Sequence, residues 1–123
     1  MKNRFKLIMS LMIFLLVGCA ADTHSSLSGE MISNMEKLVE VLESVKDSSS
    51  SKQAILKIKE INELAEQIQE RMTKLNEPSE DITKDLEQKY SSRAGEASAR
   101  LREVVGGLIE TEFGLDIMNA LNN

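Results

Sequence analysis

The chain has 123 residues, of which 41% are hydrophobic, 28% are charged and only 3% are aromatic, and its formal net charge at pH 7 is −5. This length allows one domain, and the shortage of aromatic residues argues against a β-sandwich or β-barrel, since a core of Leu, Ile, Val, Met and Ala favours packing of helix on helix. A single cysteine excludes an internal disulfide, and a single histidine excludes His-rich metal sites and ordinary nucleophile–base pairs.

The N-terminus has the features of a bacterial export signal in the required order. Three basic residues among the first six precede an apolar run over 7–17 that is interrupted only by Ser10. The run is too short for a stable membrane-spanning helix. Residues 1–18 are therefore predicted to be a signal peptide that takes no part in the fold.

The apolar run ends in Leu16-Val17-Gly18-Cys19, which resembles the lipobox of bacterial lipoproteins. The resemblance covers only the start of the chain, up to this cysteine. It implies that the thiol of Cys19 is diacylated, that the preceding peptide is removed, and that in many bacteria the new amino group is acylated as well. More than one acyl chain makes the membrane attachment effectively permanent, and no cofactor is expected besides this covalent lipid. The alternatives are an ordinary cleaved signal that leaves Cys19 as a free thiol, and an uncleaved N-terminal membrane anchor.

The mature chain implied by this resemblance is strongly acidic. It has 105 residues and keeps all 20 acidic residues but only 12 of the 15 basic ones, so its formal charge is −8. Nucleic acid and anionic lipid headgroups would both repel such a chain, so no nucleic-acid partner is expected. By analogy with Gram-negative lipoproteins, Ala20 after the cysteine favours the periplasmic face of the outer membrane. In a cell with one membrane, the anchor would lie on its outer face.

Residues 19–26 are predicted to form a lipidated tether, and residues 27–123 a helical domain. The tether is short, polar and without periodicity, and His24 within it is expected to be solvated because no nearby group orients it. From Leu27 onward, apolar residues recur at steps of three and four. This spacing predicts an amphipathic helix that ends near Asp47.

Two polar stretches are predicted to separate three helices. The serines of residues 48–51 form the first loop, and Ser50 with Gln53 matches a capping box that begins the second helix. Pro78 disfavours helical backbone at Glu77 and fits the first turn of a third helix. The predicted apolar stripe of that third helix comprises Ile82, Leu86, Tyr90, Ala94, Ala97, Leu101, Val104 and Leu108.

These elements predict an all-α fold: an elongated, antiparallel three-helix bundle in which each helix buries one face against the other two. The pair Gly106-Gly107 predicts a kink or hinge in the third helix, since each glycine costs about 1 kcal/mol relative to alanine in a helix interior. Residues 109–121 continue the apolar spacing beyond it. They predict a short fourth helical segment that either folds back onto the bundle or projects from it.

Two groups of residues are candidates for binding a partner. The first is a seam of small residues in the third helix, which either docks a partner helix or is the closest approach of the bundle's own helices. The second is the glycine pair with the C-terminal segment, which is either a lid over the core or an apolar patch for a partner or the membrane. The candidate residues are Ala94, Gly95, Ser98, Gly106, Gly107, Phe113 and Ile117.

The sequence contains no pattern typical of an enzyme or a metal site. Di-iron bundles need Glu-x-x-His on facing helices, but His24 lies outside every predicted helix. No calcium loop and no Gly-rich phosphate loop occurs in the sequence. With Cys19 expected to carry lipid, the chain is predicted to be neither an enzyme nor a metalloprotein.

The leading hypothesis is a lipid-anchored envelope protein that acts by protein–protein contact, as an accessory or scaffold. Its partners would be the membrane, through the anchor, and another envelope protein. A second hypothesis is a carrier of lipid or another apolar small molecule, which needs an apolar cavity and for which Met31, Met35 and Met72 would form an adaptable lining. A third is an immunity or exclusion lipoprotein that blocks an incoming toxin or conjugation machine.

Overall fold

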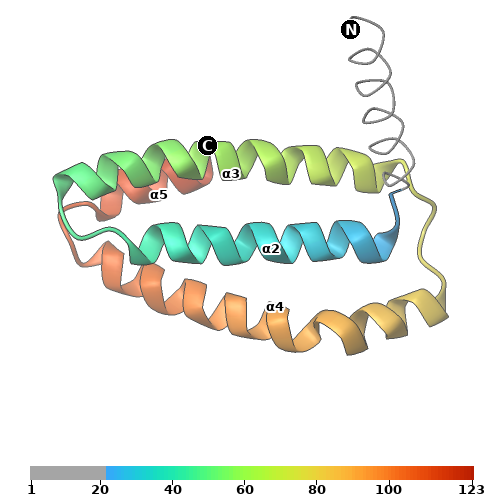
Figure 1. The fold of residues 1–123 in the computed structure, drawn as a ribbon. Helices are drawn as coiled ribbons and strands as arrows, with labels where there is room; N and C mark the ends of the chain where they lie inside the picture. Colours follow the sequence, from blue (N-terminus) through green and yellow to red (C-terminus); the bar gives the residue numbers. More distant parts are fainter. Residues whose placement is uncertain (1–21) are drawn as a thin grey trace, which may run out of the picture.

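The computed structural model describes residues 22–123. In this range the chain contains no strand, and the all-α prediction is confirmed for it. Its helices are α2 (His24–Glu43), α3 (Ser48–Thr73), α4 (Glu80–Ile109) and α5 (Gly114–Asn122), shown in Figure 1.

The predicted signal peptide, the lipobox and Cys19 lie outside the described residues. Between residues 22 and 123, no helix is both long enough and apolar enough to cross a membrane. The described chain begins at Asp22, whose carboxylate binds the side chain of Arg71 on α3.

Each long helix begins after a polar side chain that accepts a hydrogen bond from a free backbone N–H. Thr23 caps α2, with its Oγ1 atom 3.0 Å from the backbone nitrogen of Ser26. Asp47 caps α3, with Oδ1 2.7 Å from the backbone nitrogen of Ser50, and replaces the capping box that the sequence predicted between Ser50 and Gln53. The hydroxyl of Ser79 caps α4 in the same way.

Two helices begin earlier than the sequence predicted. α2 begins at His24 rather than Leu27, so residues 24–26 are helical and do not belong to the tether. α3 begins at Ser48, so residues 48–51 form its first turn and not a loop. Serine is well tolerated there, because the first backbone N–H groups of a helix have no partner within the helix and side-chain oxygens can supply one.

The helices alternate in direction along one long axis (Figure 1). α2 lies between α3 and α4, and hydrogen bonds at both of its ends show that α2 and α4 are parallel. Near the start of α2, Lys89 Nζ donates to Ser25 Oγ at 3.1 Å. Near its end, Arg100 Nη2 donates to Glu43 Oε1 at 2.7 Å.

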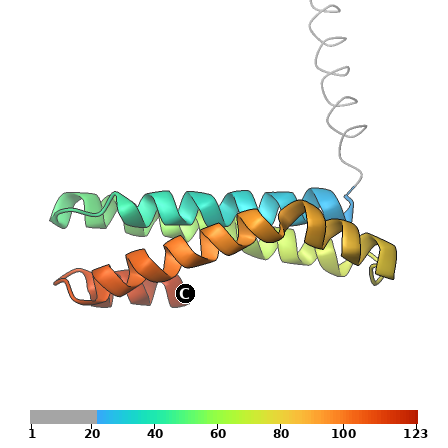
Figure 2. The ribbon, with the colours of Figure 1, turned by 90° about the horizontal axis from the view of Figure 1, so that it is seen from below.

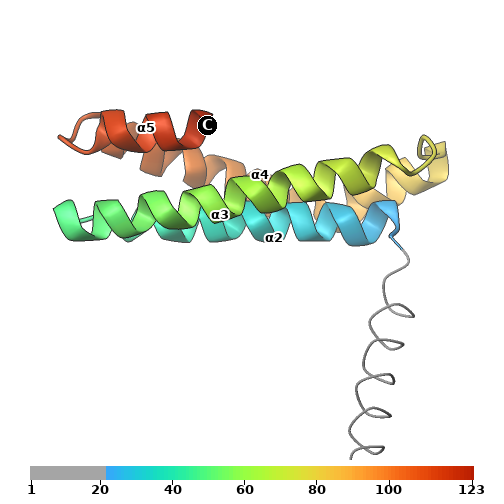
Figure 3. The ribbon, with the colours of Figure 1, turned by 90° about the horizontal axis from the view of Figure 1, so that it is seen from above.

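α3 and α4 are held apart. The backbone of α2 contacts both α3 and α4, and the backbone of α5 also contacts α3 and α4. No Cα atoms of α3 and α4 lie within 8 Å of each other. Figures 2 and 3 show α5 beside the last turns of α4. The predicted mutual contact of all three long helices is therefore not confirmed, because α3 and α4 are bridged by α2 and α5.

The main core lies at the end of the molecule that contains α5. One buried cluster joins Leu42 of α2, Ala54 and Ile58 of α3, Leu108 of α4 and Ile117 of α5. Complete burial of a Leu or Ile side chain contributes about 1.5–3 kcal/mol to the stability of the fold. Each of the four helices therefore contributes apolar burial to this end of the fold.

The chain does not break at Gly106-Gly107, where the sequence predicted a kink or hinge. α4 continues through both glycines to Ile109, and the chain reverses only after this residue. The reversal brings Gly114 so close to α4 that a Cβ atom on it would lie 2.6 Å from the carbonyl oxygen of Leu108. α5 then folds back along α3, which confirms the fold-back alternative.

Candidate functional site: an uncovered apolar groove

α5 covers only part of the gap between α3 and α4. It has 9 residues, whereas α4 has 30. At a rise of 1.5 Å per residue these lengths are about 14 Å and about 45 Å. The last turn of α5 reaches Asn62, whose Nδ2 atom donates to the carbonyl oxygen of Ala120 at 3.1 Å. Beyond Asn62, α2 is the only helix of the described chain that bridges α3 and the first half of α4.

An apolar groove lies in this uncovered region, and we call it the α3–α4 groove. It is a shallow, open depression of about 360 Å³ between α2, α3 and α4. Leu86 also lines a larger cavity of about 800 Å³ that adjoins the groove, which we call the end cavity. The large apolar and aromatic side chains that line the groove are Met31 and Ile32 of α2, Met72 of α3, and Leu86 and Tyr90 of α4.

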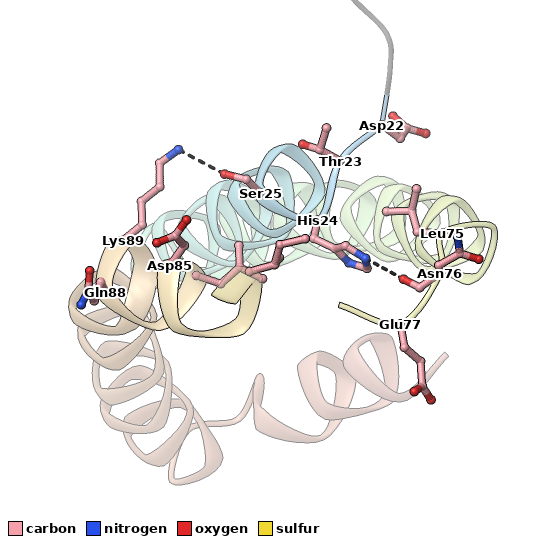
Figure 4. Close-up of a pocket in the computed structure, with 12 residues that line it drawn as sticks. Asp22, Thr23, His24, Ser25, Leu75, Asn76, Glu77, Asp85, Gln88 and Lys89 are labelled. Carbon is pink, nitrogen blue, oxygen red and sulfur yellow. Dashed lines mark hydrogen bonds between the residues drawn. The ribbon is translucent and has the colours of Figure 1, made fainter. Parts of the chain in front are cut away.

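The end cavity lies where α2 starts, beside the α3–α4 loop and the first turns of α4 (Figure 4). Leu75 and Ile82 line it together with Leu86. His24 Nε2 donates to the carbonyl oxygen of Asn76 at 2.7 Å and so holds the loop against α2. This contact corrects the prediction that His24 is a solvated residue of the tether.

Carboxylates predominate among the charged groups around both cavities. Glu77 and Asp85 line the end cavity, and Glu87 lines the groove. Lys89 lies beside them and donates to Ser25 Oγ (Figure 4). The rim of the site is therefore acidic, which favours a partner with positive charge around an apolar surface.

Arg71 fixes the start of the described chain to α3. Its Nη2 and Nε atoms donate to the two carboxylate oxygens of Asp22 at 2.6 and 3.0 Å. Two further hydrogen bonds, at 3.0 and 3.1 Å, join it to Glu30 of α2. The hydrogen bonds from Arg71 hold the pKa of Asp22 below its ordinary value of 3.8. The point at which the tether meets the domain is thus pinned by a fork-shaped ion pair.

Tyr90 forms one wall of the groove and depends on a close approach to α2. Its hydroxyl donates to the carbonyl oxygen of Ser25 at 2.9 Å. A Cβ atom on Gly29 would lie 2.8 Å from this hydroxyl oxygen, so glycine leaves the room that the ring occupies. Gly29 was not among the residues predicted to matter, although an isolated glycine within an apolar helical pattern indicates close packing.

The structure separates the seven candidate partner-binding residues into two places. In the middle of α4, Ala94 lines the α3–α4 groove. Ser98 faces α2, with its hydroxyl 3.9 Å from the sulfur of Met35. Gly95 is exposed, and a Cβ atom there would meet no atom within 4 Å. Of the three methionines predicted to line a cavity, the groove brings together two, Met31 and Met72.

The other four candidates lie at the opposite end of the molecule. Gly106 and Gly107 are exposed on α4 and have open space beside them. Phe113 packs against the core, and Ile117 is only 1% exposed within it. The packing of these last two side chains agrees with the interpretation of the C-terminal segment as a lid.

The groove was not predicted from the sequence, because the whole apolar stripe of α4 was expected to lie in the core. Ile82 is 41% exposed, and Leu86 and Tyr90 are only half-buried. The sequence does contain an indication of the groove. The predicted fourth helical segment, residues 109–121, is much shorter than the apolar stripe of α4 and cannot cover the whole stripe.

The described residues contain no metal-binding cluster, since no three His, Cys, Asp or Glu side chains among them are placed to hold an ion. A comparison of the chain with protein-family models, with curated proteins and with solved structures finds no match. What residues 22–123 offer for function is apolar surface with an acidic rim.

Proposed function

We propose that this chain is a lipid-anchored protein of the bacterial cell envelope that acts by protein–protein contact, as an accessory or scaffold protein. The lipobox at residues 16–19 supports the anchor, with covalent lipid on Cys19 and no other cofactor. The α3–α4 groove carries the interaction, because it leaves apolar side chains of three helices uncovered. Ala20 supports the periplasmic face of the outer membrane as the location in a Gram-negative cell.

The folded part of the proposed lipoprotein is one elongated, antiparallel three-helix bundle with α5 as a short fourth helix. The alternation of helix directions in Figure 1 supports this description. So does the position of α2, which packs against both α3 and α4. The groove is then the part of the bundle in which the position of a fourth helix is vacant.

The groove suits an amphipathic helix of the partner. A partner helix in line with α5 would cover Met72, Leu86 and Tyr90, in the way that other apolar grooves bind helices. Methionine side chains adapt to the shape of a bound surface. The acidic rim supports a partner helix that carries Lys or Arg beside its apolar face.

Photo-crosslinking in native membranes tests this function. A photoreactive amino acid replaces Leu86 in the groove, and the matched control replaces Glu70, which lies on the opposite face of α3 from Met72 by helical phase. We expect a discrete protein adduct from position 86 and none from position 70. Equal adducts from both positions, or only from position 70, would contradict a function of the groove in protein binding.

A carrier of lipid or another apolar small molecule is a second candidate. The apolar side chains of Leu75, Ile82 and Leu86 in the end cavity favour it, although polar residues form most of the lining and the cavity is open to solvent. The same crosslinking experiment separates the two functions. A carrier would yield lipid adducts at position 86, and organic extraction of the purified protein would release a bound apolar compound.

A further inference from the structure

The segment between the proposed lipid anchor and the folded domain is short. From Cys19 to Asp22 the chain spans at most about 10 Å when fully extended. Asp22 is fixed at the other side of this segment, because its carboxylate accepts hydrogen bonds from two nitrogen atoms of Arg71. Lipid on Cys19 would therefore hold the start of α2 close to the bilayer surface.

The start of α2 lies at one end of an elongated molecule (Figure 1). We call this the proximal end. It also contains the α3–α4 loop and the first turns of α4, which surround the end cavity (Figure 4). The distal end contains α5. The two ends are separated by roughly the length of the 30-residue α4, about 45 Å.

We propose that the proximal end is a membrane-contact face, which rests on the bilayer with Ile82 entering the interface between headgroups and acyl chains. This inference rests on the proposed lipid anchor. Ile82 is 41% exposed, although it is a large apolar residue, and it lies in the first turn of α4. Leu75 lines the end cavity beside it. The bilayer is thus the surface nearest to the apolar groups of this end.

The acidic flank of α3 opposes a flat orientation of the bundle on the bilayer. Overall charge does not distinguish the proximal end, because residues 22–26 and 71–89 contain six acidic and four basic residues, and this net −2 is in proportion to their share of the −8 on residues 22–123. A flat orientation would press acidic flanks against lipid headgroups, which costs desolvation of the charged groups. Four exposed carboxylates follow the flank of α3, at Glu60, Glu63, Glu66 and Glu70.

This orientation also determines where a protein partner can bind. It holds the exposed side chains of Ile109 and Leu115 at the distal end, away from the lipid. The α3–α4 groove opens on the side of the bundle, between the bilayer and α5. A partner helix would therefore reach the groove from the aqueous side, above the membrane surface.

Depth-dependent fluorescence quenching tests the orientation. The full chain is expressed with its signal, purified as the processed lipoprotein and reconstituted into phosphatidylcholine vesicles. Ile82→Cys carries a fluorophore at the proximal end, and Leu115→Cys, at a position that is 73% exposed, is the matched distal control. Acylation of Cys19 leaves the introduced thiol as the only one available for labelling. The quencher is phosphatidylcholine with a spin label near its headgroup.

We expect quenching to be several-fold stronger at position 82 than at position 115. Glu77→Cys, in the exposed α3–α4 loop, keeps Ile82 in place and should give the same contrast. Equal quenching at all positions, or stronger quenching at position 115, would overturn the proposed orientation and leave the lipid anchor standing. Labelling of the parent protein, which lacks an introduced cysteine, would show that Cys19 is free and would overturn the anchor together with the orientation.

Discussion

Replacing Gly114 by alanine should loosen α5 from the end of α4. The new Cβ atom would lie 2.6 Å from the carbonyl oxygen of Leu108, and 2.9 Å from both the Cα and the carbonyl oxygen of Ile109. All three are backbone atoms, which cannot rotate away as a flexible side chain can. The first turn of α5 must therefore shift, and Ile117, which is buried in the core three residues later, must shift with it.

Gly114→Ala should lower the free energy of unfolding by the cost of overpacking, which is typically about 1–3 kcal/mol. For a domain of this size, each 1 kcal/mol changes the melting temperature by about 4–8 °C. Gly107→Ala is the matched control, because a Cβ atom there meets no atom within 4 Å. Alanine is favoured over glycine in a helix interior by about 1 kcal/mol, so this control should melt at a higher temperature than the parent chain.

Thermal unfolding followed by circular dichroism, on chains that begin at Asp22, measures both variants. The expected order of melting temperature is Gly107→Ala, then the parent chain, then Gly114→Ala. If Gly114→Ala melts with the parent chain or above it, the close approach of α5 to α4 is refuted, and with it the account of how the chain reverses.

Two further substitutions test the core and the helix caps. Leu42→Ala removes a fully buried side chain and should lower the free energy of unfolding by about 2–5 kcal/mol. The control Leu56→Ala, at an exposed position, should change this free energy by no more than about 0.5 kcal/mol. Equal effects of the two substitutions in urea unfolding would contradict the placement of the core. Hydrogen bonds from Ser50 hold the pKa of Asp47 below its ordinary value of 3.8. The stability from this cap is therefore complete at pH values well above 3.8 and is lost as the pH falls through the lowered pKa. Asp47→Ala should accordingly weaken the fall of the melting temperature below about pH 5.

The helices and the main core could be predicted from the sequence, because burial follows the helical period. Leu42, Ile58 and Leu108 lie on the predicted stripes and are buried together. The helix starts were harder to predict, since Ser, Thr and Asp serve both loops and the first turns of helices. Residues 48–51 are helical because Asp47, directly before the run, is the N-cap of α3 and forms a capping box with Ser50.

The groove could not be predicted from periodicity. The residues Ile82, Leu86 and Tyr90 show the same spacing whether a fourth helix covers them or not. Periodicity indicates which face of a helix is apolar, but it does not indicate what lies opposite that face. The place of α5 depends on the reversal at Gly114, a close backbone approach that leaves no signal in hydrophobic spacing.

The predicted hinge at Gly106-Gly107 was wrong for a related reason. A glycine pair lowers helix stability by about 2 kcal/mol in total, an amount that packing of neighbouring side chains offsets. Leu108, directly after the pair, is buried in the core and keeps α4 helical to Ile109. The glycines therefore mark an exposed strip of α4 rather than its end.

The proposed envelope function and the proposed orientation both depend on lipid at Cys19. Mass spectrometry of the protein extracted from its own membranes measures this modification. We expect a polypeptide that begins at Cys19 and carries a diacylglyceryl group on the sulfur, and Cys19→Ser should abolish this species. A polypeptide of unmodified mass with a free thiol at Cys19, or one that retains residues 1–18, would refute both proposals.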